Sequence, residues 1–206
     1  MIVELVFPAS GGSLPTDHAY PLYGALSGIV PAFHDAASRL RFHQIIGESQ
    51  GEGRLRLAER SILRVRLPDD AIRLALPLAG KRIAIGEDSV RLGVPAVRTL
   101  VPAPTLVCRL ATFKNADSPE EFLATARLKL ADLGIQGDPQ LPIHLDGPRA
   151  GQPKRRVVRI HGTVIVGYSL IVADLSAADS LRLQEVGLGG RTRMGCGFFV
   201  ALKEGK

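Results

Sequence analysis

The sequence lacks the residue types and patterns that mark several classes of protein. It has no tryptophan, aromatic residues make up 5% of it, and its two cysteines, Cys108 and Cys196, lie far apart. The absence of CxxC and HExxH spacings excludes the usual signatures of a metal site, and unpaired thiols suit a reducing cytoplasm. No apolar run approaches the roughly 18 residues of a membrane span. The start of the chain is not basic and carries Glu4, which argues against a signal peptide.

Arginine is what the chain has in excess. Its 206 residues include 26 Lys and Arg against 20 Asp and Glu, a formal net charge of +6, and 20 of the basic residues are arginine. Guanidinium groups bind phosphate through two parallel hydrogen bonds, so the balance favours a polyanionic partner such as nucleic acid. A modest excess of this kind nevertheless usually means only a solvated surface, so charge alone does not decide between the two.

Strand-length apolar runs alternate with helical patterns, and the series occurs twice. The first half predicts strands at 2–7, 40–48, within 53–68, and over 81–86 and 89–94. It also predicts a helix over about 19–30, capped by Thr16 or Asp17 and ended by Pro31, and a short helix that opens at Pro68 and is cut at Pro77. The proline-rich stretch 93–104 is the predicted seam.

The second half repeats the order. It predicts a strand at 105–113, a helix over 118–134, a hairpin of 155–162 and 163–175 turning at Gly162 and Thr163, a helix capped by Ser176, and a last strand at 197–204. Each half therefore reads β-α-β-β-α-β, which is the ferredoxin-like order. The sequence predicts an α+β protein of two tandem ferredoxin-like domains with antiparallel sheets, residues 1–94 and residues 95–206.

The segment GLGGRTRMGCG, Gly187–Gly197, is the most distinctive stretch. It is not a Walker loop, because Cys196 stands where the phosphate-binding lysine is needed, and Thr192 breaks the dinucleotide fingerprint. Glycines let a backbone approach a ligand and expose its N–H groups, and Arg191 and Arg193 add positive charge, so the segment favours anion binding. A structural turn between helix and strand is the alternative.

The same segment has the form GhGxxxxxGhG, where h is apolar, with basic residues in the middle. It resembles the C-terminal signature of the Cas-six family, the CRISPR-associated endoribonucleases of the RAMP superfamily. The stretches HAYPLYGALSGIVPAFH and VVRIHGTVIVGYSLIV are similar to the family in outline. The short length and GLGGRTRMGCGFF resemble its MYXAN-type subfamily. A likeness of MGCGFFV to the RNP1 strand of RNA-recognition motifs is partial, because Met194 replaces a basic residue and Cys196 an aromatic one.

The resemblance implies a cytoplasmic, metal-independent endoribonuclease that needs no cofactor and has no membrane partner. Such an enzyme binds CRISPR repeat RNA and cuts precursor crRNA by attack of a 2′-OH, leaving 5′-OH and 2′,3′-cyclic phosphate ends. Whether the product stays bound in a type I interference complex with other CRISPR-associated subunits is open. The alternative is a non-catalytic RAMP-type RNA-binding scaffold subunit. A small-molecule enzyme is disfavoured, because no nucleotide or nucleophile motif is present.

His34, in VPAFHDA after Pro31, is the candidate general base, because imidazole titrates near neutral pH and the family places its base at the end of the first helix. A helix-end histidine that interacts with the helix dipole is the alternative. His43 is the second candidate. His18 belongs to the helix start, His144 looks structural and His161 lies at the hairpin turn. The family often has a tyrosine on this helix, but Ser27 aligns there with Tyr23 one turn earlier, so the general acid stays unassigned.

The expected RNA-binding residues combine the glycine loop with the basic start of the hairpin. They are Gly187, Gly189, Gly190, Arg191, Arg193, Gly195, Gly197, Lys154, Arg155 and Arg156. A further row of basic residues occupies even positions, which puts its members on one face if the segment is strand throughout: Arg54, Arg56, Arg60, Arg64 and Arg66. If the AERS segment turns the chain, the row splits.

Overall fold

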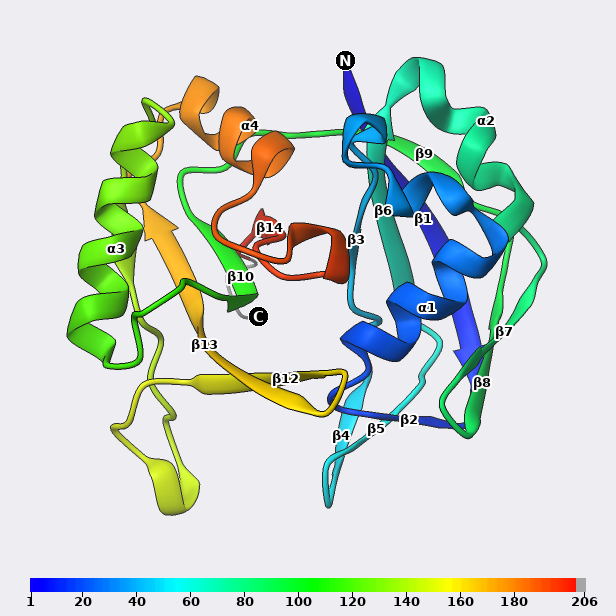
Figure 1. Ribbon diagram of the computed structural model, residues 1–206, viewed down its shortest axis with the longest axis horizontal. Helices are drawn as coiled ribbons and strands as arrows, with labels where there is room; N and C mark the ends of the chain where they lie inside the picture. The colour runs from blue at the N-terminus through cyan, green and yellow to red at the C-terminus, as the bar shows by residue number, and fades with distance from the viewer. Residues whose placement is uncertain (203–206) are drawn as a thin grey trace. The chain divides into compact units, whose positions relative to one another are not determined.

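The structure, a computed structural model, describes residues 1–202 and divides the chain into two compact units (Figure 1). The first unit comprises Met1–Leu100 and Arg193–Gly195, and the second begins at Val101. The first unit extends beyond the predicted boundary at residue 94 because β9 (Ala96–Thr99) still pairs with β1 (Ile2–Gly11). Each unit is built around its own antiparallel sheet.

The main sheet of the first unit has the strand order β3-β6-β1-β8-β7, and β9 pairs with β1 off this path. Its other strands are β3 (Arg41–His43), β6 (Ile62–Pro68), β7 (Arg82–Ile85) and β8 (Asp88–Leu92). Counted along the chain, β1, β3, β6 and β8 lie in the ferredoxin-like order 2-3-1-4. A small separate sheet is formed by β2 (Ser13–Pro15), β5 (Arg54–Arg56) and β4 (Glu48–Gly51). The strand predicted over 40–48 is confined to β3, because the chain leaves the sheet after His43.

Two helices cover one face of this sheet, α1 (Ala19–Ile29) and the single-turn α2 (Ile72–Ala75) (Figure 1). Short 3-10 turns flank them: η1 (Pro31–His34), η2 (Ala36–Ser38), η3 (Asp69–Ala71) and η4 (Leu76–Leu78). Alternate residues of β1 point into the core beneath the helices, where Leu5 and Phe7 are fully buried with Leu22 and Leu26 of α1. The predicted helix cap was wrong, since the N-cap is His18 and its side chain makes no capping bond.

The predicted row of arginines splits. Arg54 lies on β5 and forms an ion pair with Asp88, and Arg56 pairs with Glu48. Across the intervening turn, Arg64 and Arg66 on β6 both bind the buried carboxylate of Glu4, at 2.8 and 3.0 Å. Burial lowers the pKa of Arg66 to about 10 in spite of the opposing effect of Glu4. These four guanidinium groups are therefore neutralised inside the unit and do not form a track for phosphates.

The second unit repeats the topology with the strand order β11-β13-β10-β14, again 2-3-1-4 along the chain. Its strands are β10 (Leu106–Ala111), β11 (Asp138–Gln140), β12 (Arg155–Ile160), β13 (Thr163–Ala173) and β14 (Phe199–Ala201), and β12 extends β13 as a hairpin. Its helices are α3 (Pro119–Asp132) and α4 (Ala177–Val186), with 3-10 turns η5 (Gly147–Arg149) and η6 (Thr192–Met194). Phe122, Leu183 and Phe199 meet in one core. The tandem ferredoxin-like prediction is confirmed.

Local signals in this half were accurate at the helices and less so at the strands. Ser118 caps α3 in a complete capping box with Glu121, and Ser176 caps α4. The hairpin turns at His161 and Gly162, both with positive φ, one residue before the predicted turn. The last strand is shorter than 197–204, and the final part of that prediction lies outside the described residues. No helix within residues 1–202 is long and apolar enough to cross a membrane.

The buried carboxylate of Glu4 provides a test of this first unit. Replacing Glu4 with Ala leaves two guanidinium groups without their shared partner, so the free energy of unfolding should fall by about 3–5 kcal/mol. The matched control is Glu48→Ala, whose pair with Arg56 is exposed and should contribute less than about 1 kcal/mol. Urea unfolding followed by circular dichroism measures both, and equal losses would contradict the assignment.

Candidate active site

His34 stands at the end of a short turn that the sequence forces out of the first helix. Pro31 cannot continue α1, and the chain enters η1 there. The turn buries Phe33 completely, and its ring packs edge-on against Phe42 with centroids 6.1 Å apart. The next side chain, His34, is exposed. The buried phenylalanine thus anchors the turn while the imidazole faces solvent.

Tyr23 is the partner of this imidazole. Its Oη lies 2.9 Å from Nδ1 of His34, and the two rings meet edge-on with centroids 5.4 Å apart. Ser27 occupies the position at which the resembling family often has a tyrosine. It is buried, and its hydroxyl donates to the carbonyl of Tyr23. The tyrosine one helical turn earlier therefore takes the place beside the histidine. Its partial exposure on an apolar helix that ends near His34 is the signal that could have identified it.

The charged residues around His34 have separate tasks. Asp35 accepts the N–H of Ala37 at 2.8 Å and caps η2, so the adjacent carboxylate is engaged with the backbone. Arg193 donates from Nη1 to the backbone carbonyl oxygen of His34. Burial, and then the neighbouring guanidinium of Arg39, lower the pKa of Arg41. Arg193 thus brings one positive charge to the backbone of His34.

The GhGxxxxxGhG signature has a backbone explanation. A Cβ at Gly189 would lie 2.6 Å from the carbonyl oxygen of Thr112, and one at Gly197 would lie 2.2 Å from that of Leu188. The N–H of Leu188 bonds to the carbonyl of Gly197 at 3.2 Å, which closes the loop at its base. The two apolar positions, Leu188 and Cys196, are buried. The glycines allow this closure, and the apolar residues anchor it in the core.

The expected RNA-binding residues of the loop divide into two groups. Gly187, Gly195 and Gly197 are buried and shape the loop, whereas Gly189, Gly190, Arg191 and Arg193 are exposed. The N–H of Gly190 is already bonded to the carbonyl of Thr112 at 2.8 Å. Positive charge in the loop therefore comes from the arginine side chains. Arg191 extends from a backbone with φ of 56°, and no described residue pairs with its guanidinium group.

The start of the hairpin supplies the other expected basic residues. Arg155 is exposed, and Lys154 and Arg156 are half-buried. Arg156 donates from Nε to the hydroxyl of Ser169 at 3.3 Å, and burial together with nearby Arg149 lowers its pKa. Within residues 1–202 none of the three has a carboxylate partner. Unlike the arginines of β5 and β6, these side chains are open to an anion.

The comparisons with known proteins decide the family. The family described as Cas6 Crispr matches residues 3–204. The CRISPR-associated endonuclease Cas6 of Myxococcus xanthus (strain DK1622) is 39% identical over 200 residues, which cover 97% of this chain and 81% of that protein. The chain belongs to the Cas6 family. The family predicted from the glycine signature is thus confirmed, and with it the class of CRISPR-associated endonucleases.

Solved structures support the same fold for this Cas6-family chain. A CRISPR associated protein Cas6 has a TM-score of 0.64 at 11% identity, with 98% of this chain and 99% of that chain covered. A RAMP protein described as binding different RNA substrates has a TM-score of 0.62 at 15% identity, with 98% and 100% covered. A Cas6-related protein from Pyrococcus furiosus has a TM-score of 0.60 at 14% identity, with 100% and 99% covered. At these identities the likeness shows the fold.

The other histidines of this Cas6-family chain are placed differently. His18 is fully buried, where Nδ1 donates to the carbonyl of Pro15 at 2.7 Å and Nε2 accepts the N–H of Ile45 at 3.0 Å. His43, the second candidate base, is 5% exposed, and its Nδ1 donates to the carbonyl of Gln44 at 2.6 Å. Both rings are held in the interior by backbone groups, so neither is accessible in the way His34 is. His144 is half-buried and His161 is exposed at the hairpin turn.

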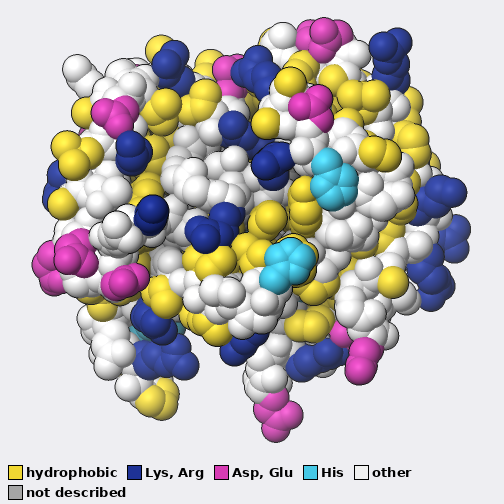
Figure 2. All heavy atoms as spheres, viewed as in Figure 1, with side chains coloured by type: hydrophobic (Ala, Val, Ile, Leu, Met, Phe, Trp, Pro, Cys, Tyr) yellow, Lys and Arg dark blue, Asp and Glu magenta, His cyan; other side chains and the backbone are white. Residues whose placement is uncertain are grey.

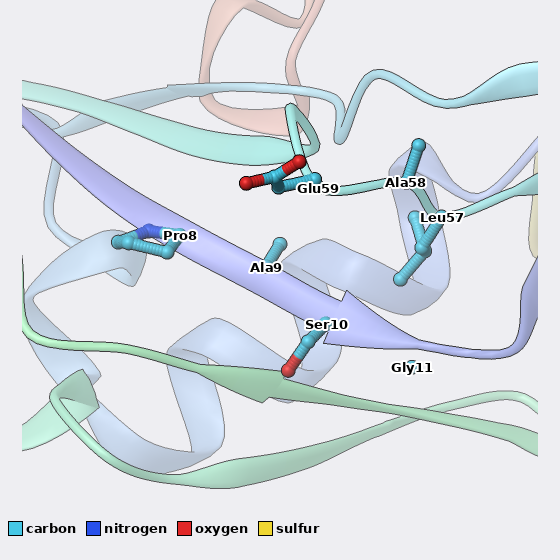
Figure 3. Close-up of a pocket in the computed structure, with 7 residues that line it drawn as sticks. All are labelled: Pro8, Ala9, Ser10, Gly11, Leu57, Ala58 and Glu59. Carbon is cyan, nitrogen blue, oxygen red and sulfur yellow. The ribbon is translucent and has the colours of Figure 1, made fainter.

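One hollow of the first unit shares no residue with this site. It encloses about 410 Å³ between the end of β1 and the chain before β6, and no residue expected in the site lines it (Figure 3). Lys and Arg side chains lie at many separate positions on the face shown in Figure 2. Within residues 1–202, no three His, Cys, Asp or Glu side chains gather as a set of metal ligands.

Substitution of His18 tests the structural assignment. Alanine there leaves the carbonyl of Pro15 and the N–H of Ile45 buried without partners, at a cost of about 1–3 kcal/mol for each group. Urea unfolding should show that loss, and a variant as stable as the wild type would contradict it. The control is His161→Asn, exposed and at positive φ, which asparagine tolerates, with an expected change within about 0.5 kcal/mol.

Proposed function

We propose that this chain is a metal-independent endoribonuclease that binds CRISPR repeat RNA and cuts precursor crRNA into guide units. Its membership of the Cas6 family supports the substrate class. The hydrogen bond between Tyr23 and exposed His34 carries the proposal, because it joins two proton-transferring side chains at an accessible place.

The proposed reaction is an internal transfer within the RNA. The 2′-oxygen attacks the adjacent phosphorus, a bond from O2′ to phosphorus forms, and the bond from phosphorus to O5′ breaks. One proton leaves the 2′-OH and another is delivered to O5′. The products are a 2′,3′-cyclic phosphate and a 5′-OH. The protein has to supply a base, an acid and positive charge beside the phosphate.

The hydrogen bond to Tyr23 constrains how His34 can be the base. A neutral imidazole has one N–H and one free lone pair. If Nδ1 carries the proton and donates it to Oη of Tyr23, Nε2 is left free to take the proton of the 2′-OH. The phenol then has its own proton to donate. Tyr23 is thereby the proposed acid, or the donor to a phosphate oxygen, in this assignment.

The RNA backbone is the proposed ligand of the open basic side chains. Arg191 on the glycine loop and Lys154, Arg155 and Arg156 on the hairpin have no carboxylate partners among the described residues, so phosphates can pair with them. Each neutralised phosphate releases counterions, so binding should weaken steeply with salt. A cytoplasmic location, and retention of the product beside other CRISPR-associated subunits, belong to the same proposal.

Cleavage of cognate repeat RNA in EDTA tests this function. His34→Ala should slow single-turnover cleavage by about 10²–10⁴-fold, because the base is lost, with RNA affinity unchanged. Tyr23→Phe should also slow it, whereas Ser27→Ala, on the same helix, should not. Denaturing gels measure the rate, and filter binding the affinity.

Two results would overturn the proposal. If His34→Ala cuts at the wild-type rate, the base has been misassigned. If the wild type binds the repeat but leaves it uncut both in EDTA and with Mg²⁺ restored, the chain is a non-catalytic RNA-binding scaffold instead.

A further inference from the structure

We infer that Arg193 and Gly195 act on the chemistry by positioning His34, rather than by binding RNA. This inference deepens the proposed function and rests on it. The residues expected to form one RNA clamp would then have two tasks. Arg191 faces the RNA, and Arg193–Gly195 hold the turn that carries the base.

The first contact is made by the side chain of Arg193. Its Nη1 donates to the backbone carbonyl oxygen of His34. The hydrogen bonds within the turn run from Phe33 N–H to the Val30 carbonyl and from Asp35 N–H to the Ala32 carbonyl, both 3.1 Å. They hold the residues on either side of His34, and Arg193 adds a charge-assisted bond at the carbonyl oxygen of His34 itself. The backbone from which the imidazole extends is thereby tied to the glycine loop.

The second contact is made by Gly195, beneath the same turn. A Cβ at this position would lie 3.0 Å from Cε2 of Phe42, and the residue has φ of +77°. Phe42 in turn packs edge-on against Phe33, the residue before His34. The backbone at Gly195 therefore packs against Phe42, one of the two rings that anchor the turn. Residues 193–195 accordingly group with the first unit, to which His34, Phe33 and Phe42 belong.

A small displacement at this position has a large catalytic effect. In-line attack needs the base within hydrogen-bond reach of the 2′-OH, and an error of about 1 Å can cost about 10²-fold in rate. His34 is exposed and sits on a single turn, so its backbone depends on neighbours for a fixed position. Arg193 and Gly195 approach that turn from the loop, one at the carbonyl and one at the aromatic anchor.

The two arginines of the signature provide the decisive contrast. Arg193→Ala should lower the single-turnover cleavage rate by about 10–100-fold, with the affinity for repeat RNA unchanged. Arg193→Lys keeps a charged donor and should restore much of the rate. Arg191→Ala should instead weaken RNA binding. Arg182→Ala, an exposed charge on α4, controls for the loss of one positive charge.

A double-mutant cycle tests whether Arg193 acts through His34. In the His34→Ala background, Arg193→Ala should change the residual cleavage rate by less than about threefold, because residues that act as a unit are non-additive. If Arg193 bound the scissile phosphate directly, the two losses would multiply. Gly195→Ala should reproduce the rate loss, whereas Gly12→Ala, which has open space around its Cβ, should not.

The outcomes separate this inference from the function on which it rests. The positioning role is overturned if the rate losses of the two substitutions multiply. It is also overturned if the RNA affinity of the Arg193→Ala protein falls as much as its cleavage rate. Either result leaves the proposed endoribonuclease function unaffected. A fully active His34→Ala protein overturns both. If the residual rate of His34→Ala is too low to measure, two other results decide whether Arg193 positions His34. These are a lower cleavage rate with unchanged RNA affinity in Arg193→Ala, and the recovery of the rate in Arg193→Lys.

Discussion

The absence of a side chain at two glycines is the constraint on which the candidate site depends. At Gly197 a Cβ would collide with the carbonyl oxygen of Leu188, so only glycine allows these two residues to close the loop at its base. At Gly189 a Cβ would collide with the carbonyl oxygen of Thr112. The two apolar residues of the signature are buried, and much of the segment between them is exposed. That segment carries both arginines. The glycines of this motif therefore allow a close backbone packing from which two guanidinium groups extend.

The turn that carries His34 depends on a second constraint, at the opposite end of the chain. Pro31 ends the first helix, Phe33 fills the core, and His34 is left facing solvent. The helix that it leaves also supplies Tyr23, so one short stretch of sequence provides both proposed proton-transfer groups. Arg193 links this turn to the glycine loop. The proposed site thus combines residues from both ends of the sequence, and each is positioned by its own local constraint.

The sequence predicts those features that depend on neighbouring residues in the chain. It does not predict contacts between residues that are far apart in the chain. Ser118, Ser176 and Pro31 mark their helix boundaries by capping or by the missing N–H, and the glycine signature identified the family. The ion pairs of the arginines on β6 could not be predicted, because their partner Glu4 lies on another strand of the sheet. The same holds for the burial of His43 and for Tyr23 beside His34. The contact from Arg193 joins residues 159 positions apart, which no local pattern reveals.

The central claim is that the RNA supplies its own nucleophile and the protein supplies the base. The most direct measurement places one 2′-deoxy nucleotide immediately 5′ of the scissile phosphate and follows cleavage in EDTA. The account predicts that this RNA binds with unchanged affinity and is not cut, while the all-ribose RNA yields 2′,3′-cyclic phosphate and 5′-OH ends. Cleavage of the deoxy-substituted RNA at the same phosphate would show that water or another group attacks, and would contradict the account.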